Sequence, residues 1–151
     1  KGFSVDLKGP FGRFGLFSLQ EPPNRAVLLA GGVGISPLRS MIQESIKKHA
    51  GLPIQLFYGI RTPKDLLFQK EFERYEKKGQ FWMIPAVSDK DPKQPWTGKT
   101  GFISDCLEGD IFPPIEGTHI FLCGPPPMVK ATQAKLSSLG YQRQAVHLEA
   151  W

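Results

Sequence analysis

Short runs of apolar residues alternate along this chain with stretches in which apolar residues recur every three or four positions. The runs predict strands at 26–30, 53–58, 81–87, 118–123 and 144–149, and the stretches between them predict helices at 37–50, 64–78, 103–107 and 126–139. Because strands and helices alternate, we expect right-handed crossover connections. The pattern therefore predicts an α/β fold with a doubly wound, Rossmann-like, five-stranded parallel sheet.

The first residues follow a different pattern. Phe3, Val5 and Leu7 alternate with polar residues, as expected for a half-buried antiparallel strand. Residues 9–12 then predict a turn, and the proline-rich segment 21–24 predicts a linker. We therefore divide the chain into residues 1–20 and a domain over residues 21–151.

A glycine-rich turn follows the first strand of that domain and leads directly into a helix. It consists of Gly31, Gly32, Val33, Gly34, Ile35, Ser36 and Pro37. Such a turn presents backbone N–H groups and the positive end of a helix dipole, which together bind phosphate. The glycines begin a dinucleotide fingerprint, although Pro37 stands where a third glycine is usual. We expect Ser36 to cap the helix with Pro37 at its first position; the alternative is that the glycines only make a tight turn.

A second turn of the same kind follows the fourth strand. It contains Cys123, Gly124, Pro125 and Met128. Since the carboxyl ends of parallel strands meet at one edge of a sheet, the two turns are expected to hold one nucleotide between them. Cys123 then either contacts a nicotinamide ring or is a small buried core residue.

Two other strand ends supply candidates for the adenosine side. Gly59 and Arg61 follow the second strand, where a nicotinamide dehydrogenase normally places an acid. Arg61 is interpreted as a contact for adenine or phosphate, or else as a surface arginine. Asp89 follows the third strand, where a carboxylate accepts hydrogen bonds from a ribose 2′-hydroxyl and repels a 2′-phosphate. The alternative for Asp89 is an Asx turn.

Composition narrows the possible functions. The net charge of +5 comes without a basic stripe interleaved with aromatic residues, so no nucleic-acid partner is expected. No apolar run is long enough to span a membrane, and the cysteines Cys106 and Cys123 predict neither a metal site nor an oxidising environment. Gly98-Lys99-Thr100 is not a P-loop, because Lys93 stands where that motif requires glycine.

Together these motifs resemble the nucleotide-binding domain of the ferredoxin–NADP reductase superfamily, over essentially the whole chain. The pattern Gly-Gly-x-Gly-x-(Ser/Thr)-Pro lies at 31–37, Cys-Gly-Pro-x-x-Met at 123–128, and Glu-x-aromatic at Glu149 and Trp151. The resemblance implies that the first turn binds pyrophosphate and that Ser36, Cys123 and Glu149 contact the nicotinamide as the catalytic residues. It also implies that Trp151 stacks on the flavin.

The same resemblance implies that residues 1–20 are the end of a flavin-binding β-barrel and its exit linker. The family's flavin motif, Arg-x-Tyr-(Ser/Thr), is absent, so FAD would be held mostly by a flavin-binding domain of the same polypeptide outside this sequence. Ser88-Asp89 and the segment 96–102 look like those of NADH-using reductases of multicomponent oxygenases and of sodium-translocating quinone reductases.

The function that the resemblance implies is an NADH-dependent flavoprotein oxidoreductase. It would pass a hydride from NAD(H) to FAD and then electrons to an iron–sulfur domain, an oxygenase, a quinone or a cytochrome. The expected location is the cytoplasm or the cytoplasmic face of a membrane complex. The alternatives are an NADPH-preferring reductase of the same fold, a non-catalytic module that senses NAD(H) or docks a partner, and a different doubly wound fold that binds FMN.

Overall fold

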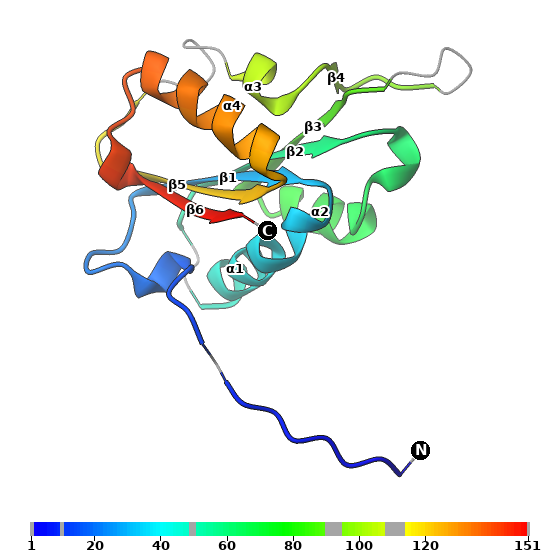
Figure 1. The fold of residues 1–151 in the computed structure, drawn as a ribbon, viewed down its shortest axis with the longest axis vertical. Coiled ribbons are helices and arrows are strands. Elements are labelled where there is room, and N and C mark those ends of the chain that lie inside the picture. The colour runs from blue at the N-terminus through cyan, green and yellow to red at the C-terminus, as the bar shows by residue number, and fades with distance from the viewer. Residues whose placement is uncertain (1, 10, 49–50, 90–94, 108–113, 151) are drawn as a thin grey trace.

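The computed structural model describes residues 2–9, 11–48, 51–89, 95–107 and 114–150. Its centre is a parallel six-stranded sheet with the strand order β4-β3-β2-β1-β5-β6 (Figure 1). The strands are β1 (Arg25–Gly31), β2 (Ile54–Ile60), β3 (Phe81–Val87), β4 (Lys99–Thr100), β5 (Thr118–Gly124) and β6 (Val146–Ala150). The helices are α1 (Ile35–Lys48), α2 (Gln69–Glu76), α3 (Ile103–Cys106) and α4 (Pro126–Ser138).

Helices cover both faces of the sheet, with α1 and α2 on one side and α3 and α4 on the other (Figure 1). The central strand β1 is buried on both faces, as its continuous apolar sequence predicts. Its residues alternate between two cores: Leu28 packs in the core that includes α1, and Leu29 packs in the core that includes α4. The predicted doubly wound architecture is confirmed.

The structure corrects the sequence-based prediction in three details of the domain. The sheet has a sixth strand, β4, whose two residues are too few to give a periodic pattern. Helix α1 begins at Ile35, after a 3₁₀ turn at Gly32–Gly34, so Ser36 lies in the first turn of the helix and does not cap it. The helix predicted at 64–78 is divided into a 3₁₀ turn (Pro63–Asp65) and α2, because Phe68 has a left-handed backbone (φ 59°) that a right-handed helix cannot contain.

The strand predicted near the N-terminus is wrong for this structure. Residues 2–9 form no strand and extend away from the domain (Figure 1). Phe3, Val5 and Leu7 are 96%, 77% and 91% exposed. The physical reason is that a strand needs a neighbour to pair its backbone groups and cover its apolar face, and no strand in the described part of the chain pairs with this segment.

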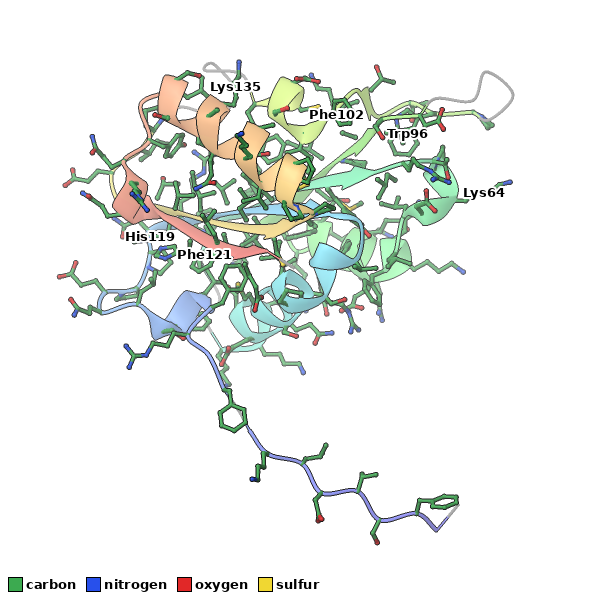
Figure 2. All side chains as sticks on the ribbon, viewed as in Figure 1. Lys64, Trp96, Phe102, His119, Phe121 and Lys135 are labelled. Atoms are coloured by element: carbon green, nitrogen blue, oxygen red, sulfur yellow. The ribbon has the colours of Figure 1, made fainter. Side chains whose placement is uncertain are left out.

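Close to the domain, the N-terminal segment packs on β5. Leu16, in a 3₁₀ turn at Leu16–Ser18, is buried, and the Phe14 ring meets the Phe121 ring edge-on at 5.7 Å between centroids. Phe121 in turn stacks on His147, whose Nε2 lies 2.9 Å from Nδ1 of His119. Figure 2 shows His119 and Phe121 on this side of the sheet. The two histidines therefore satisfy each other as structural residues of β5 and β6.

Glu71 ties the two helices on this face together. Its carboxylate forms an ion pair with Arg39 of α1 at 2.8 Å, and it accepts hydrogen bonds from Gln43 Nε2 at 2.7 Å and Tyr75 Oη at 2.9 Å. Burial alone would raise the pKa of Glu71, but these hydrogen bonds and the Arg39 charge outweigh it, and the pKa lies below its usual value. Arg39 also lies 4.3 Å from the centroid of Phe68.

This network predicts a pH-dependent contribution to stability. A carboxyl whose pKa is lowered in the folded state stabilises the fold above its ordinary pKa, and the contribution is lost as the pH falls through the folded-state pKa. We expect Glu71→Gln to lower the free energy of unfolding by about 1–2 kcal/mol at neutral pH, because hydrogen bonds to a charged group are lost. The deficit should shrink as the pH falls below about 4.3, the ordinary pKa of glutamate.

The measurement is urea unfolding of both proteins at several pH values. Glu44→Gln is the matched control, since Glu44 forms an exposed ion pair with Lys48 on α1. Such pairs contribute less than about 1 kcal/mol. If Glu71→Gln lowered the free energy of unfolding by the same amount at every pH, the stabilising role of the Glu71 charge would be contradicted.

Candidate functional site

A cleft of ≈ 890 Å³ opens at the carboxyl ends of the strands. Its walls come from both glycine turns, from the segments after β2 and β3, and from the start of α3 and of α4. Figure 2 labels Phe102 beside α3 and Lys64 after β2, two residues of this wall that come from different elements. This is the place where doubly wound sheets bind their ligands.

The two glycine turns touch at the inner end of the cleft. In the parallel register of β1 and β5, Ala30 pairs with Cys123, so Gly31 and Gly124 follow side by side. A β-carbon placed on Gly124 would lie 3.3 Å from the Gly31 Cα and 3.0 Å from the Met128 sulfur. A β-carbon on Gly31 would collide with the same sulfur. A side chain at either position would therefore have to displace the end of the Met128 side chain, which fills the space between the turns.

The first turn presents backbone to the cleft. Gly32 has a positive φ of 53°, which favours glycine, and Gly32 and Val33 are exposed. Gly34 and Ile35 are buried directly behind them, and α1 starts at this point. The turn thus points the N-terminal end of a long helix into the cleft, an arrangement that favours an anion such as pyrophosphate.

Seven of the residues predicted from the sequence to bind a cofactor line the cleft. They are Gly31, Gly32, Val33, Gly59, Arg61, Pro125 and Met128. The remaining ones lie beside it: Gly34, Ile35, Cys123 and Gly124 are buried, Ser36 and Pro37 belong to the first turn of α1, and Asp89 and Glu149 are exposed outside the cleft wall. Trp151 lies outside the described residues.

Cys123 and Glu149 pair across β5 and β6 at the carboxyl edge of the sheet. The Cys123 side chain is fully buried, and Glu149 reaches solvent. Burial, with a smaller effect from the negative charge of Glu149, raises the pKa of the Cys123 thiol to about 11. The thiol is therefore protonated and neutral at physiological pH.

On the opposite side of the cleft, the ends of β2 and β3 remain hydrogen-bonded beyond the last residues of the strands. The Ser88 N–H donates to the Ile60 carbonyl at 3.0 Å, and the Asp89 N–H donates to the Arg61 carbonyl at 2.8 Å. This pairing places Arg61 and Asp89 next to each other, with both side chains exposed. Ser88 lines the cleft and Asp89 lies just outside its wall.

Sequence analysis missed several lining residues. Phe102, 66% exposed, and Leu67, 41% exposed, give the cleft an apolar wall, and Lys64 adds a cation. Phe102 comes to the cleft because α3 packs directly on β2: a β-carbon on Gly59 would lie 2.8 Å from the Ile103 side chain. No local pattern around Phe102 indicates this contact.

Asp65 is the one missed residue that has a sequence signal, the spacing Thr62-x-x-Asp65 of a capping box. Its carboxylate accepts hydrogen bonds from the Thr62 N–H at 2.8 Å and from the Thr62 Oγ1 at 2.9 Å. The backbone hydrogen bond is the main reason that the pKa of Asp65 is lowered. The carboxylate is therefore directed at its own turn, although the charge of Arg61 also helps to lower its pKa. Arg61 and Lys64 place two cations at the cleft wall.

The described part of the chain contains no group of three or more His, Cys, Asp or Glu side chains placed to hold a metal ion. None of the helices described there has the length and apolar character needed to cross a membrane.

Comparisons with known proteins show the family to which the chain belongs. Residues 28–134 match the family model of the oxidoreductase NAD-binding domain, a range that contains both glycine turns. The chain is 33% identical over 148 residues to the electron transfer component of xylene/toluene monooxygenase from Pseudomonas putida, covering 96% of this chain and 41% of that protein. It is also 33% identical over 153 residues to a component of the Na⁺-translocating NADH-quinone reductase of Klebsiella pneumoniae, covering 98% of this chain and 37% of that protein.

Among solved structures, the cytochrome b5 reductase domain of nitrate reductase from Ulva prolifera is similar, with a TM-score of 0.81 and 26% identity. The similarity covers 94% of this chain and 59% of that one. The chain thus spans about two fifths of the curated relatives named above.

The burial of Cys123 makes a prediction about its reactivity. In a Cys106→Ala background, we expect the folded chain to resist alkylation by iodoacetamide at neutral pH, because only the thiolate reacts. The alkylation rate should rise with pH towards about 11. Mass spectrometry of the alkylated chain measures the rate, and the urea-unfolded protein is the control that should react quickly. Fast alkylation of the folded chain at neutral pH would show a thiolate and contradict this description.

Proposed function

This chain belongs to the family of oxidoreductase NAD-binding domains of the ferredoxin reductase type, as its motifs indicate, and from that premise we propose that the cleft binds NADH for hydride transfer to FAD. The observation that carries the proposal is the contact of the two glycine turns at the inner end of the cleft. It brings the N-terminal end of α1, with its backbone N–H groups, next to the positive end of the α4 dipole. Pro125, Pro126 and Pro127 at the start of α4 have no N–H to donate, so the backbone donors come from the first turn.

In this proposal the pyrophosphate lies against Gly32, Val33 and Gly34 at the start of α1. The cleft is long enough to contact the segments after β1, β2, β3 and β5, so one dinucleotide can extend along them. The protein holds and orients the nucleotide, and the hydride chemistry belongs to the nicotinamide and the flavin. Because the nicotinamide and the flavin carry the chemistry, the described cleft wall needs no nucleophile paired with a base.

The adenosine end is assigned to the wall made by Leu67 and Phe102. Their exposed apolar surfaces suit the faces of a purine ring. Ser88 and Asp89 lie beside this wall, where the Asp89 carboxylate would accept a hydrogen bond from the ribose 2′-hydroxyl and repel a 2′-phosphate. We therefore propose a preference for NADH.

The nicotinamide end is assigned to Ser36, Cys123 and Glu149. Ser36 is exposed in the first turn of α1, and Glu149 lies at the same carboxyl edge on β6. Because Cys123 is buried and neutral, its role would be to pack beside the ring rather than to exchange a proton. Trp151 keeps its proposed role of covering the flavin.

For the whole protein we propose a flavin-dependent NADH reductase. FAD would be held mainly by another domain of the same polypeptide, and residues 1–20 would be the end of that domain and its exit linker. The exposed alternation of Phe3, Val5 and Leu7 suits a strand that pairs outside the described domain. Electrons would pass on to an iron–sulfur domain, an oxygenase, a quinone or a cytochrome, in the cytoplasm or at the cytoplasmic face of a membrane complex. The relatives named above are an electron transfer component of a monooxygenase and a component of a quinone reductase.

A second candidate is a preference for NADPH. It is supported by the two cations that line the adenosine side of the cleft, Arg61 and Lys64. The Asp65 carboxylate accepts hydrogen bonds from Thr62, which turn it towards its own backbone rather than towards a phosphate in the cleft. A 2′-phosphate would gain from both cations. The position of Asp89 beside Arg61 opposes this alternative.

The test is calorimetric titration of the chain with NADH and with NADPH. We expect tighter binding of NADH, and we expect Asp89→Arg to shift the ratio of the two affinities towards NADPH by about tenfold or more, equivalent to about 1.4 kcal/mol. Glu44→Arg makes the same charge change away from the cleft and should leave the ratio unchanged. Tighter binding of NADPH to the unaltered chain would favour the second candidate, and no binding of either nucleotide would refute the proposal.

Phe102 gives a separate prediction. Phe102→Ala removes the exposed ring from the cleft wall and should weaken NADH binding by about 1 kcal/mol, the typical value of an aromatic pair. Phe11→Ala is the control, because Phe11 is 84% exposed in the N-terminal segment and does not line the cleft. The same titration measures both variants, and equal affinities would place the adenine elsewhere.

A further inference from the structure

Two sulfur atoms lie at the meeting point of the glycine turns, and their surroundings differ. Cys123, one residue before Gly124, is fully buried and protonated. Met128, in the first turn of α4, is half-buried and lines the cleft. A thioether reacts with oxidants without first losing a proton, whereas a neutral buried thiol is inert. Of these two residues, Met128 is the one that solvent reaches, so its sulfur is the candidate for oxidation.

The Met128 side chain is also packed closely against both glycine turns. It occupies the space beside both Gly31 and Gly124, and its methyl group would lie 3.2 Å and 2.9 Å from β-carbons built on these residues. Gly31 begins the turn that receives the pyrophosphate in the proposed function, and Gly124 begins the turn packed beside it. A change at this sulfur therefore acts directly on the geometry of the anion-binding surface.

We propose that Met128 is an oxidation site through which hydrogen peroxide switches off nucleotide binding. In the reaction the O–O bond of the peroxide breaks, one oxygen atom forms a bond to Met128 Sδ, and the other leaves as water. The sulfur loses two electrons and the peroxide gains them. The regulatory part of this inference rests on the proposed function, since it concerns the same cleft.

The effect follows from the size and polarity of the product. A sulfoxide adds an oxygen atom to an apolar side chain and makes it a hydrogen-bond acceptor. That oxygen must either stand beside Gly31 and Gly124, against which the side chain is already closely packed, or turn into the cleft, where it would meet the anion. Both positions disfavour a bound pyrophosphate. In the opposite direction, a bound nucleotide covers the sulfur and slows its oxidation.

The other methionines provide an internal comparison. Met41 is 5% exposed in the core beneath α1. Met83, on β3, is half-buried like Met128 but does not line the cleft. Peroxide should therefore reach Met128 and Met83 more readily than Met41, and only the oxidation of Met128 should respond to nucleotide.

The first experiment treats the chain with hydrogen peroxide, with and without saturating NADH, and follows each methionine peptide by mass spectrometry. Oxidation adds about 16 Da, the mass of one oxygen atom. We expect Met128 to be oxidised faster than Met41 and to be protected by NADH, with the rate at Met83 unchanged by NADH. Equal effects of NADH on Met83 and Met128 would mean general stabilisation and overturn the assignment.

The second experiment measures the NADH affinity of treated and untreated samples. We expect peroxide to weaken binding by about tenfold or more in the unaltered chain, equivalent to about 1.4 kcal/mol, and methionine sulfoxide reductase to restore it. Met128→Leu, compared with its own untreated sample, should show no loss, and Met83→Leu should lose affinity as the unaltered chain does. Met128→Gln, which places a polar group at the same point, should bind weakly without peroxide.

The outcomes separate this inference from the proposed function. If the untreated chain does not bind NADH, the proposed function fails and the regulatory inference fails with it. If the untreated chain binds NADH and oxidation at Met128 leaves the affinity unchanged, the proposed function stands and this inference is refuted. A loss of affinity that persists in Met128→Leu would also refute it, because another residue would then be responsible.

Discussion

The contact between Gly31 and Gly124 is the constraint on which the site depends. It exists because β1 and β5 are parallel neighbours in a register that pairs Ala30 with Cys123, so that both strands end at the same level. A side chain at either glycine would displace the end of the Met128 side chain, which fills the space beside them. The start of α1 and the start of α4 therefore meet at one point, and in the proposed function the backbone N–H groups of the first turn hold the anion there.

Along the rest of the carboxyl edge, the side chains near β6 differ in charge and polarity from those near β3. Towards β6 the sheet supplies a neutral buried thiol and an exposed carboxylate, Cys123 and Glu149. Towards β3 it supplies an apolar wall and two cations, Arg61 and Lys64, while Asp65 is held by Thr62. The nicotinamide and adenosine ends of the proposed ligand need different surroundings, and the order of the strands provides them at the two ends of one edge of the sheet.

Sequence patterns predicted those features that depend on neighbouring residues. Strand β1 could be predicted because a strand buried on both faces is continuously apolar. The glycine turns could be predicted because each links such a strand to a helix. The position of Phe102 in the cleft wall could not be predicted, because it depends on α3 packing against Gly59, which is far away in the sequence. The start of α2 was missed because its cause is a single left-handed residue, Phe68. The alternation at Phe3, Val5 and Leu7 indicates a strand but says nothing of where its pairing partner lies, and the described part of the domain offers none.

A methionine at the point where the turns meet packs well between them, but its thioether can be oxidised. An unbranched, flexible thioether can lie flat between two glycines, whereas a β-branched side chain has its bulk close to the backbone and cannot. The sulfur that permits this fit is also the atom that an oxidant attacks. Cys123, at the adjacent strand end, avoids the problem because its sulfur is buried and protonated. In the proposed function Met128 cannot be buried in the same way, because the surface beside it would have to remain open to the nucleotide. Its partial exposure would then follow from its position between the two turns.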